Sequence, residues 1–169
     1  MDTTFHLDDG SRVPRLGFGT FQLSGEDAYR SSLVALETGY RHLDTAQGYD
    51  NEAEVGRALA DSAVDPEEVF VTTKLKPSNA AAADVRRSTE ESLKKLDLDH
   101  VDLLLLHWPA EDVAPLDETM EAMTDVRDAG FASSSPMVPS RSSPAIALAP
   151  IETASPASVS DPTVPSMTL

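Results

Sequence analysis

The sequence has no cysteine among its 169 residues. This absence excludes a disulfide framework, a thiolate zinc site and a cysteine nucleophile. Basic residues are also scarce: 13 Lys and Arg face 29 Asp and Glu, which leaves a formal net charge of -16. Because so acidic a surface repels nucleic acid and anionic membranes, we expect neither as a partner.

Long hydrophobic runs are missing too. No stretch approaches the roughly 18 apolar residues of a membrane-spanning helix, and the opening MDTTFHLDDG lacks the basic start and apolar stretch of a secretory signal. We therefore expect a cytoplasmic protein.

Lysine and aromatic residues are few. Aromatic residues make up 5% of the chain, and four Lys stand beside nine Arg and seventeen Asp. Such a composition resembles that of proteins from salt-loving organisms, whose acidic surfaces stay hydrated where salt screens their self-repulsion. Ordinary acidity explains the same numbers, so both interpretations stay open.

The composition changes near Gly130. Residues 1–130 hold all 8 Gly and 27 of the 29 acidic residues, whereas residues 131–169 contain ten Ser and seven Pro. Proline at this spacing leaves no window for a helix and removes ladder donors from a strand. We expect a folded part at 1–130 and a disordered tail at 131–169.

The abrupt start of the tail has three interpretations. Out-of-frame translation of a gene of high G+C content ranks first, because it explains the sudden Ser and Pro richness together with the loss of charge. A flexible linker and a glycosylated stalk remain the alternatives.

Within residues 1–130, strand patterns alternate with helix patterns. A hairpin at 5–14 is followed by four strand-helix pairs, which predicts a parallel sheet with helices packed outside it. Ser24 and Asn51 are expected at the starts of the first two helices. The expected strands lie at 16–19, 41–45, 69–73 and 101–106, and the expected helices start near 24, 51, 81 and 116.

Polar residues close the four strands: Thr20, Asp44, Lys74 and His107. In a closed barrel of β/α units the carboxyl ends of all strands meet on one face, which carries the active site. Tyr49, five residues after Asp44, can lean over the same face. We therefore expect all five side chains in one pocket.

This set of side chains favours proton transfer to a carbonyl. A Lys ammonium beside a tyrosine hydroxyl stabilises the phenolate, so Tyr49 can act as acid or base near neutral pH. Asp44 would hold Lys74 in place, and His107 could orient a carbonyl oxygen. The sequence shows no nucleophile with an adjacent base and no set of metal ligands, which favours carbonyl reduction or alcohol oxidation with an external hydride donor.

Taken singly, each side chain has a structural alternative. A lone Lys is more often solvated, a lone His is more often buried and hydrogen-bonded, and a lone Tyr packs on a rim. Their joint order and spacing disfavour coincidence. His42 and His100, by contrast, are expected to be structural.

At these residues the chain resembles the aldo/keto reductase family, over about residues 3–130. The most specific stretch is GYRHLDTAQGYDNEAEVG at 39–56, supported by VPRLGFGTFQ at 13–22, EEVFVTTKL at 67–75 and VRRSTEESLKKLDLDHVDLLLLHWP at 85–109. The resemblance implies an α/β fold of the (β/α)8 TIM barrel type, closed at its bottom by the hairpin. It also implies reduction of a small aldehyde or ketone with NADPH, NAD being possible, and no metal.

The resemblance assigns roles residue by residue. Tyr49 is the expected proton donor, with Asp44 and Lys74 as its tuning partners and His107 aligning the carbonyl. The expected cofactor-binding residues are Gly19, Thr20 and Asp44, and the residues expected to line the substrate pocket are Phe21 and Trp108.

The sequence departs from the family after Gly130. The hairpin and the first four β/α units are present, but the later units, with most of the cofactor contacts, are not found. We expect a truncated chain that binds the cofactor weakly and is weakly active or inactive alone. The alternative is a non-catalytic fragment or an interaction module that self-associates through exposed strand edges.

Overall fold

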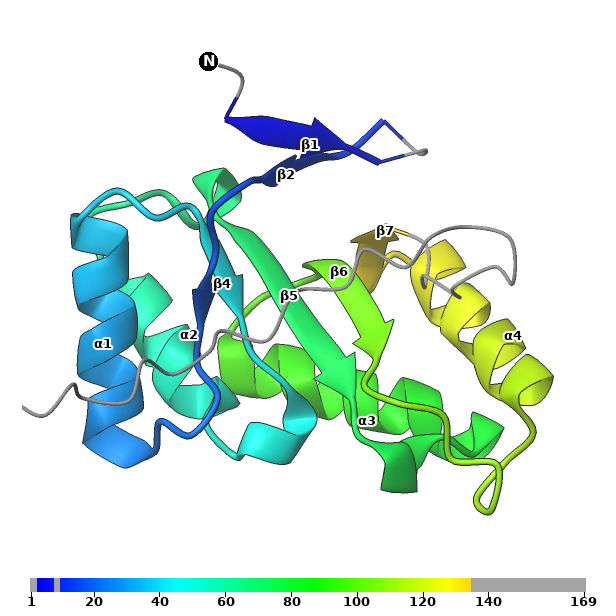
Figure 1. Cartoon of the computed structure of the whole chain (residues 1–169). Coiled ribbons are helices and arrows are strands. Elements are labelled where there is room, and N and C mark those ends of the chain that lie inside the picture. The colour runs from blue at the N-terminus through cyan, green and yellow to red at the C-terminus, as the bar shows by residue number, and fades with distance from the viewer. Residues whose placement is uncertain (1–2, 8–9, 135–169) are drawn as a thin grey trace, which may run out of the picture. The chain divides into compact units, whose positions relative to one another are not determined.

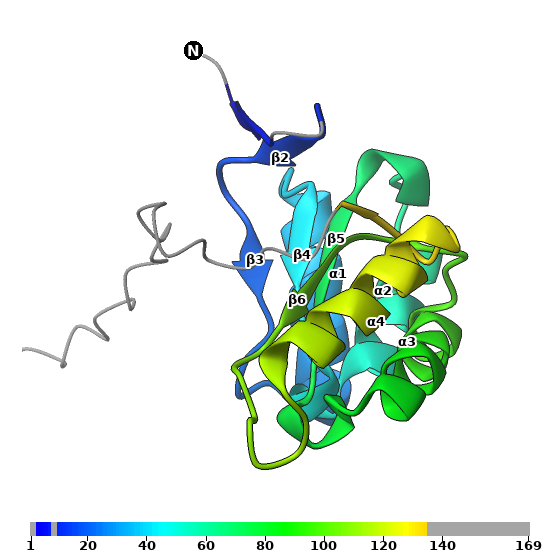
Figure 2. The same ribbon diagram turned by 90° about the vertical axis from the view of Figure 1, so that its right-hand side faces the viewer.

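Five parallel strands form one sheet in the described part of the chain, with the order β3-β4-β5-β6-β7. The computed structural model describes residues 3–7 and 10–134. Helices α1 to α4 cover one face of this sheet (Figures 1 and 2). The strands are β3 (Phe18–Gly19), β4 (His42–Asp44), β5 (Phe70–Leu75), β6 (Val101–Leu106) and β7 (Ala132–Ser134). The α-helices are α1 (Gly25–Glu37), α2 (Glu52–Asp61), α3 (Ala82–Leu96) and α4 (Leu116–Asp128), and short 3-10 turns are η1 (Gln47–Tyr49), η2 (Pro66–Glu68) and η3 (Pro77–Asn79).

The expected hairpin precedes the sheet. Strands β1 (Thr4–His6) and β2 (Arg12–Pro14) pair antiparallel. The hairpin lies beyond the amino ends of the parallel strands, opposite the ends at which the arrows point (Figure 1). It therefore sits at the bottom of the β/α unit, as the family resemblance implies.

A fifth strand extends the sheet beyond the expected boundary at Gly130. Strand β7 pairs parallel with β6, with Val101 opposite Ala132 and Leu103 opposite Ser134. The sequence Ala-Ser-Ser has no strand pattern of its own; it becomes a strand because β6 offers a free edge and Ala132 packs into the core, 4% exposed. The expected tail thus starts too early at residue 131, and its remainder, 135–169, lies outside the described residues.

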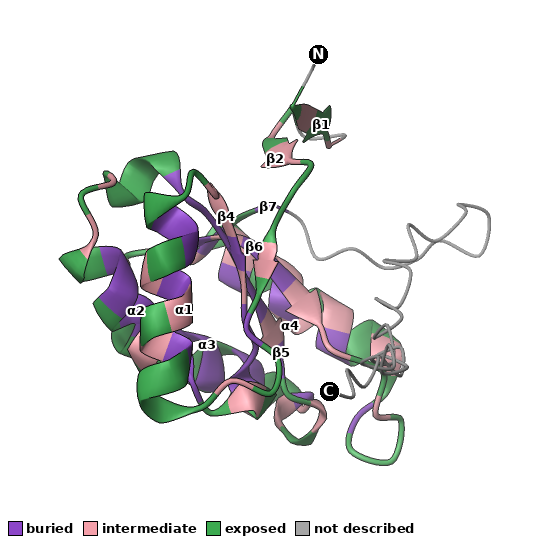
Figure 3. Cartoon of the chain, turned by 60° about the vertical axis from the view of Figure 1, so that its left-hand side comes forward, coloured by how far each residue is buried: buried purple, intermediate pink, exposed green. Residues whose placement is uncertain are grey.

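The hydrophobic core lies between the sheet and the helices, where buried residues gather (Figure 3). Leu43 and Leu75 from the sheet meet Val55 and Val85 from the helices, and all four are fully buried. Strands β5 and β6 are nearly continuous runs of apolar or β-branched residues, which suits strands in the middle of a parallel sheet. Removal of this apolar surface from water fixes the helices against the strands.

The helix ends follow the sequence signals, but the caps differ. Gly39 and Gly130 follow α1 and α4 with positive φ, as expected of residues that end helices. Ser24 and Asn51 precede α1 and α2, yet neither side chain makes a capping hydrogen bond. None of the helices described is both long and apolar enough to cross a membrane.

Helices α2 and α3 touch through a glycine. A Cβ atom on Gly56 would lie 2.5 Å from the carbonyl oxygen of Leu96 and 2.6 Å from that of Lys95. The absence of a side chain therefore lets the α3 backbone approach α2, and this contact fixes the spacing of two helices behind the sheet.

We expect Gly56→Ala to destabilise the fold by about 1–3 kcal/mol, because the methyl group must push the two backbones apart. Helix propensity alone would favour alanine by about 1 kcal/mol. A net loss of stability would therefore come from the close contact between α2 and α3. Urea unfolding followed by circular dichroism measures the change. Ala60→Gly is the control: Ala60 lies on the exposed side of α2, so this variant measures the effect of helix propensity without the contact. A Gly56→Ala protein as stable as the wild type would contradict this account.

Candidate active site

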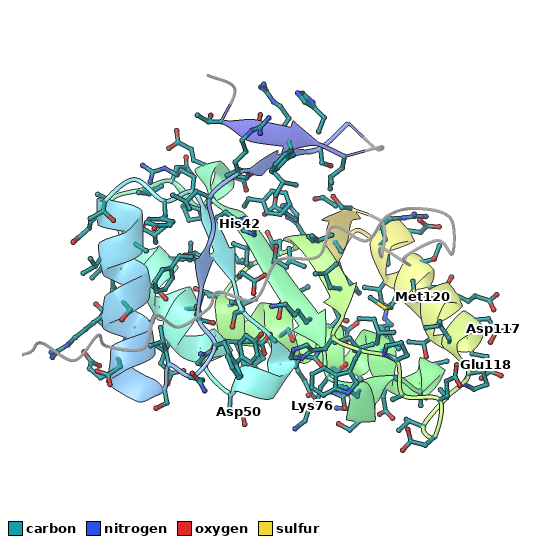
Figure 4. All side chains as sticks on the ribbon, in the orientation of Figure 1. His42, Asp50, Lys76, Asp117, Glu118 and Met120 are labelled. Atoms are coloured by element: carbon teal, nitrogen blue, oxygen red, sulfur yellow. The ribbon has the colours of Figure 1, made fainter. Side chains whose placement is uncertain are left out.

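The carboxyl ends of the strands carry the candidate site. Asp50 and Lys76 project at this end of the sheet, whereas His42 lies near the hairpin at the other end (Figure 4). Asp44 is the last residue of β4, Lys74 lies near the end of β5, and His107 directly follows β6. The fold therefore brings together residues that are 30 or more positions apart in the sequence.

Parallel register sets the distance between Asp44 and Lys74. Asp44 lies opposite Thr72 on β5, and Lys74 is two residues further along that strand. Because side chains alternate along a strand, Lys74 projects from the same face as Thr72. A two-residue offset toward the carboxyl end thus places the ammonium over the end of β4.

The Lys74 ammonium is the centre of the site. It forms an ion pair with Asp44, donates to the backbone carbonyl of Thr45 at 2.9 Å, and donates to the Tyr49 hydroxyl oxygen at 3.4 Å. The Lys74 side chain is 12% exposed and that of Asp44 is 22% exposed. One partly desolvated cation therefore contacts both a carboxylate and a phenol.

Four aromatic rings line the site in a row. Phe21 packs against Tyr49 with centroids 5.2 Å apart, and Tyr49 packs edge-on against His107 at 5.5 Å. His107 contacts Trp108 at 4.3 Å. The outer rings, Phe21 and Trp108, are exposed by 65% and 56%. The row comes from the loops after β3, β4 and β6, so it joins three strand ends.

The surroundings of His107 disfavour its charged form. Its Nδ1 atom is buried and has no hydrogen-bond partner among the residues described. Burial lowers the pKa of His107, the Lys74 charge lowers it further, and the Asp44 charge opposes both effects. A neutral imidazole beside a tyrosine hydroxyl is suited to hydrogen bonding with an uncharged carbonyl.

In the loop after β3, Thr20 and Gly19 differ in exposure. Thr20 is fully buried. Its hydroxyl donates to the carbonyl of Asp44 at 3.2 Å, and its amide donates to the same carbonyl at 2.9 Å. Gly19, by contrast, is exposed and has open space where a Cβ would be. Thr20 thus shapes the loop, while Gly19 presents a bare backbone surface at the mouth.

Two buried amides flank Tyr49, and the sequence analysis assigned neither to the site. Gln47 donates to the carbonyl of Ser88 at 3.1 Å and accepts from the Lys76 amide at 2.9 Å and from the Asn79 side chain at 2.9 Å. Asn51, expected as a helix cap, instead binds the loops after β3 and β4. The only sequence signal that could have placed Gln47 and Asn51 at the site was their position two residues before and two residues after Tyr49.

Two further polar side chains of the sheet, His42 and Asp102, lie near the amino ends of their strands, away from the site. His42 hydrogen-bonds the Thr72 hydroxyl at 3.0 Å, and burial lowers the pKa of this histidine. Asp102 accepts from the Val71 amide at 2.7 Å. In the part of the chain that the structure covers, no group of three or more His, Asp or Glu side chains could hold a metal ion.

The parallel sheet, the hairpin and the strand-end residues are those of the first half of a (β/α)8 barrel. The chain belongs to the aldo/keto reductase family, whose model matches residues 15–134.

Relatives and a solved structure agree with this assignment. The chain is 46% identical over 127 residues to an aldo-keto reductase of Mycobacterium avium (strain 104), covering 75% of this chain and 44% of that protein. It is 50% identical over 104 residues to glycerol 2-dehydrogenase (NADP(+)) of Saccharomyces cerevisiae, covering 62% and 33%. The Bombyx mori aldo-keto reductase solved in complex with NADP is 38% identical, with a TM-score of 0.68 over 78% of this chain and 48% of that one. The chain spans about half the length of these relatives, or less.

We expect Trp108 fluorescence to titrate with His107, because an imidazolium quenches the indole packed against it. The midpoint should fall below the reference value of about 6.5, since burial and the Lys74 charge lower the pKa of His107. As the pH falls, the unfolded chain binds a proton at His107 at a higher pH than the folded chain does. The contribution of neutral His107 to stability is therefore present above about pH 6.5 and is lost as the pH falls below it.

The measurement is Trp emission between pH 4 and 9. His107→Gln should abolish the transition and His100→Gln should preserve it. A midpoint at or above the reference value would contradict the buried, neutral histidine.

Proposed function

We propose that this chain carries the proton-transfer site of an NADPH-dependent reductase that converts a small aldehyde or ketone to an alcohol. The observation that carries the proposal is the Lys74 ammonium in contact with both Asp44 and the Tyr49 hydroxyl. The names of two relatives support the choice of cofactor: one is an NADP(+) dehydrogenase and the other was solved with NADP.

The mouth of the site fits a nicotinamide ring. Gly19 offers backbone with no side chain in front of it, and a planar ring can lie against such a surface. Asp44 provides acceptor oxygens at the same end of the sheet, and Thr20 holds the loop from behind. When bound, the cofactor supplies a hydride to the carbonyl carbon.

The protein supplies the proton and the orientation. In the proposed step Tyr49 donates its hydroxyl proton to the carbonyl oxygen as the hydride reaches the carbon, which yields the alcohol. Lys74 stabilises the phenolate that remains, and Asp44 holds the Lys74 ammonium in place through their ion pair. Neutral His107 hydrogen-bonds the carbonyl oxygen and points it at Tyr49, while Phe21 and Trp108 form the walls against which the substrate packs.

We expect slow, aldehyde-dependent oxidation of millimolar NADPH by the wild-type chain, followed by absorbance at 340 nm. Tyr49→Phe should lower this rate by at least about 100-fold, since positioned acid catalysis contributes that much or more. Tyr29→Phe is the matched control, because that hydroxyl contacts Asp61 on the surface. No aldehyde-dependent rate in the wild type, or an equal rate in Tyr49→Phe, would overturn the proposal.

A second candidate function is pairing with another copy of the chain through the β3 edge. Among the described strands, β3 pairs only with β4. A groove of about 350 Å³ runs beside it, with Phe18, Val34, Ala35 and Tyr40 in its lining. It contains none of the site residues, and an open parallel edge next to apolar side chains favours association. The net charge of -16 opposes contact between copies at low salt.

We expect concentration-dependent dimers by analytical ultracentrifugation in molar KCl. Val34→Asp should abolish them, because Val34 is 53% exposed in the groove. Val113→Asp is the control, as Val113 is 43% exposed elsewhere. A wild-type chain that stays monomeric in KCl, or equal association of Val34→Asp, would rule out this candidate.

A further inference from the structure

We propose that Asn51 is a positioning residue for Tyr49: its side chain ties the loops after β3 and β4 together and thereby sets the contact between Lys74 and the Tyr49 hydroxyl. The importance of this contact for catalysis rests on the proposed function, whereas the positioning itself rests on the hydrogen bonds around Asn51.

The Asn51 amide uses its full hydrogen-bonding capacity inside the protein. Its Nδ2 donates to the carbonyls of Thr20 and Leu23, both at 2.9 Å. Its Oδ1 accepts from the Thr45 hydroxyl at 2.8 Å and shares the single proton of the Thr20 hydroxyl, at 3.4 Å, with the Asp44 carbonyl. Asn51 is completely buried. Because a side-chain amide has two donors and two acceptor positions, Asn51 can hydrogen-bond groups of both loops at the same time.

The same network reaches Lys74 through Thr45. The Thr45 hydroxyl donates to Asn51, and the Thr45 carbonyl accepts from the Lys74 ammonium at 2.9 Å. Thr45 also donates its amide to the carbonyl of Thr72 on β5. The position of Asn51 is therefore linked to the position of the ammonium by one residue.

Tyr49 is held from both sides of its turn. Gln47 anchors the start of η1 to α3 through Ser88, and Asn51 anchors its end to the loops after β3 and β4. Between them, Asp50 reverses the chain with φ of 54°, a conformation that needs support from its surroundings. With both ends held, the turn places the Tyr49 hydroxyl 3.4 Å from the Lys74 ammonium.

A helix cap does not account for this arrangement. Asn51 occupies the N-cap position of α2, but its side chain makes no hydrogen bond to that helix. Its hydrogen bonds go instead to Thr20, Leu23 and Thr45, which belong to the two loops that surround the site. The Asn51 side chain therefore binds the two loops and leaves the amino end of α2 without a side-chain cap.

The test uses a chain in which Tyr49 is the single tyrosine, made by Tyr29→Phe and Tyr40→Phe. The 13C NMR resonance of its ring carbon bonded to the hydroxyl reports the nearby ammonium, and Lys74→Met defines the resonance position without it. Asn51→Asp keeps the shape but loses both donors, so its resonance should move at least halfway to the Lys74→Met position. Thr45→Val, which removes one hydrogen bond, should move it less.

Thr119→Val is the matched control, because it removes a buried hydrogen bond, to the Ala80 carbonyl, that involves neither of the loops tied by Asn51. Its resonance should stay at the wild-type position. Circular dichroism shows which variants fold. If Asn51→Asp does not fold, the resonance of Thr45→Val is the test of the positioning role. A folded variant with an unmoved resonance, or an equal shift in Thr119→Val, overturns the positioning role.

The outcomes separate this inference from the proposed function. If Lys74→Met itself leaves the resonance unmoved, the contact between lysine and tyrosine is wrong and both proposals fail. If the resonance moves as expected but no aldehyde-dependent NADPH oxidation occurs, the positioning role stands and only the reductase proposal fails.

Discussion

Parallel pairing of β4 with β5 is the constraint on which the site depends. It fixes Lys74 two residues beyond the partner of Asp44, and so brings a cation to a carboxylate at the end of the sheet. A half-buried ion pair is stabilising only when its remaining hydrogen-bonding groups are satisfied. Here the Thr45 carbonyl and the Tyr49 hydroxyl accept the other ammonium bonds, so the partners that satisfy the lysine are themselves parts of the site.

The sequence carried enough information for the β/α order and for the strand-end residues. Strand β6 was predicted at its observed bounds, because a run of six residues with one charge is typical of a buried strand in a parallel sheet. Asp44, Tyr49, Lys74 and His107 were predicted to meet, and they do so because parallel strands place their carboxyl ends on one side. These predictions rest on patterns that are local in the sequence and on one general rule of barrel geometry.

The features that sequence patterns missed all depend on tertiary contacts. Asn51 before a helix has the signature of a cap, and only the position of the loop after β3 draws its side chain elsewhere. Strand β7 needs the free edge of β6. The Thr20 hydroxyl likewise donates to a partner that no sequence pattern shows, the Asp44 carbonyl; its place beside the cofactor stays a prediction. Two of these features are polar side chains with several possible partners and the third is a strand that needs a neighbouring edge, so the fold decides the outcome in each case.

The row of rings has two fixed members and two exposed ones. Tyr49 and His107 are half-buried and sit beside Lys74, whereas Phe21 and Trp108 stand at the ends with most of their surface in solvent. Each outer ring packs against an inner one, but neither Phe21 nor Trp108 takes part in the ion pair or the hydrogen bonds of Lys74. The two ends of the row are therefore positions where a substitution changes the exposed surface without removing the ion pair or a hydrogen bond of Lys74.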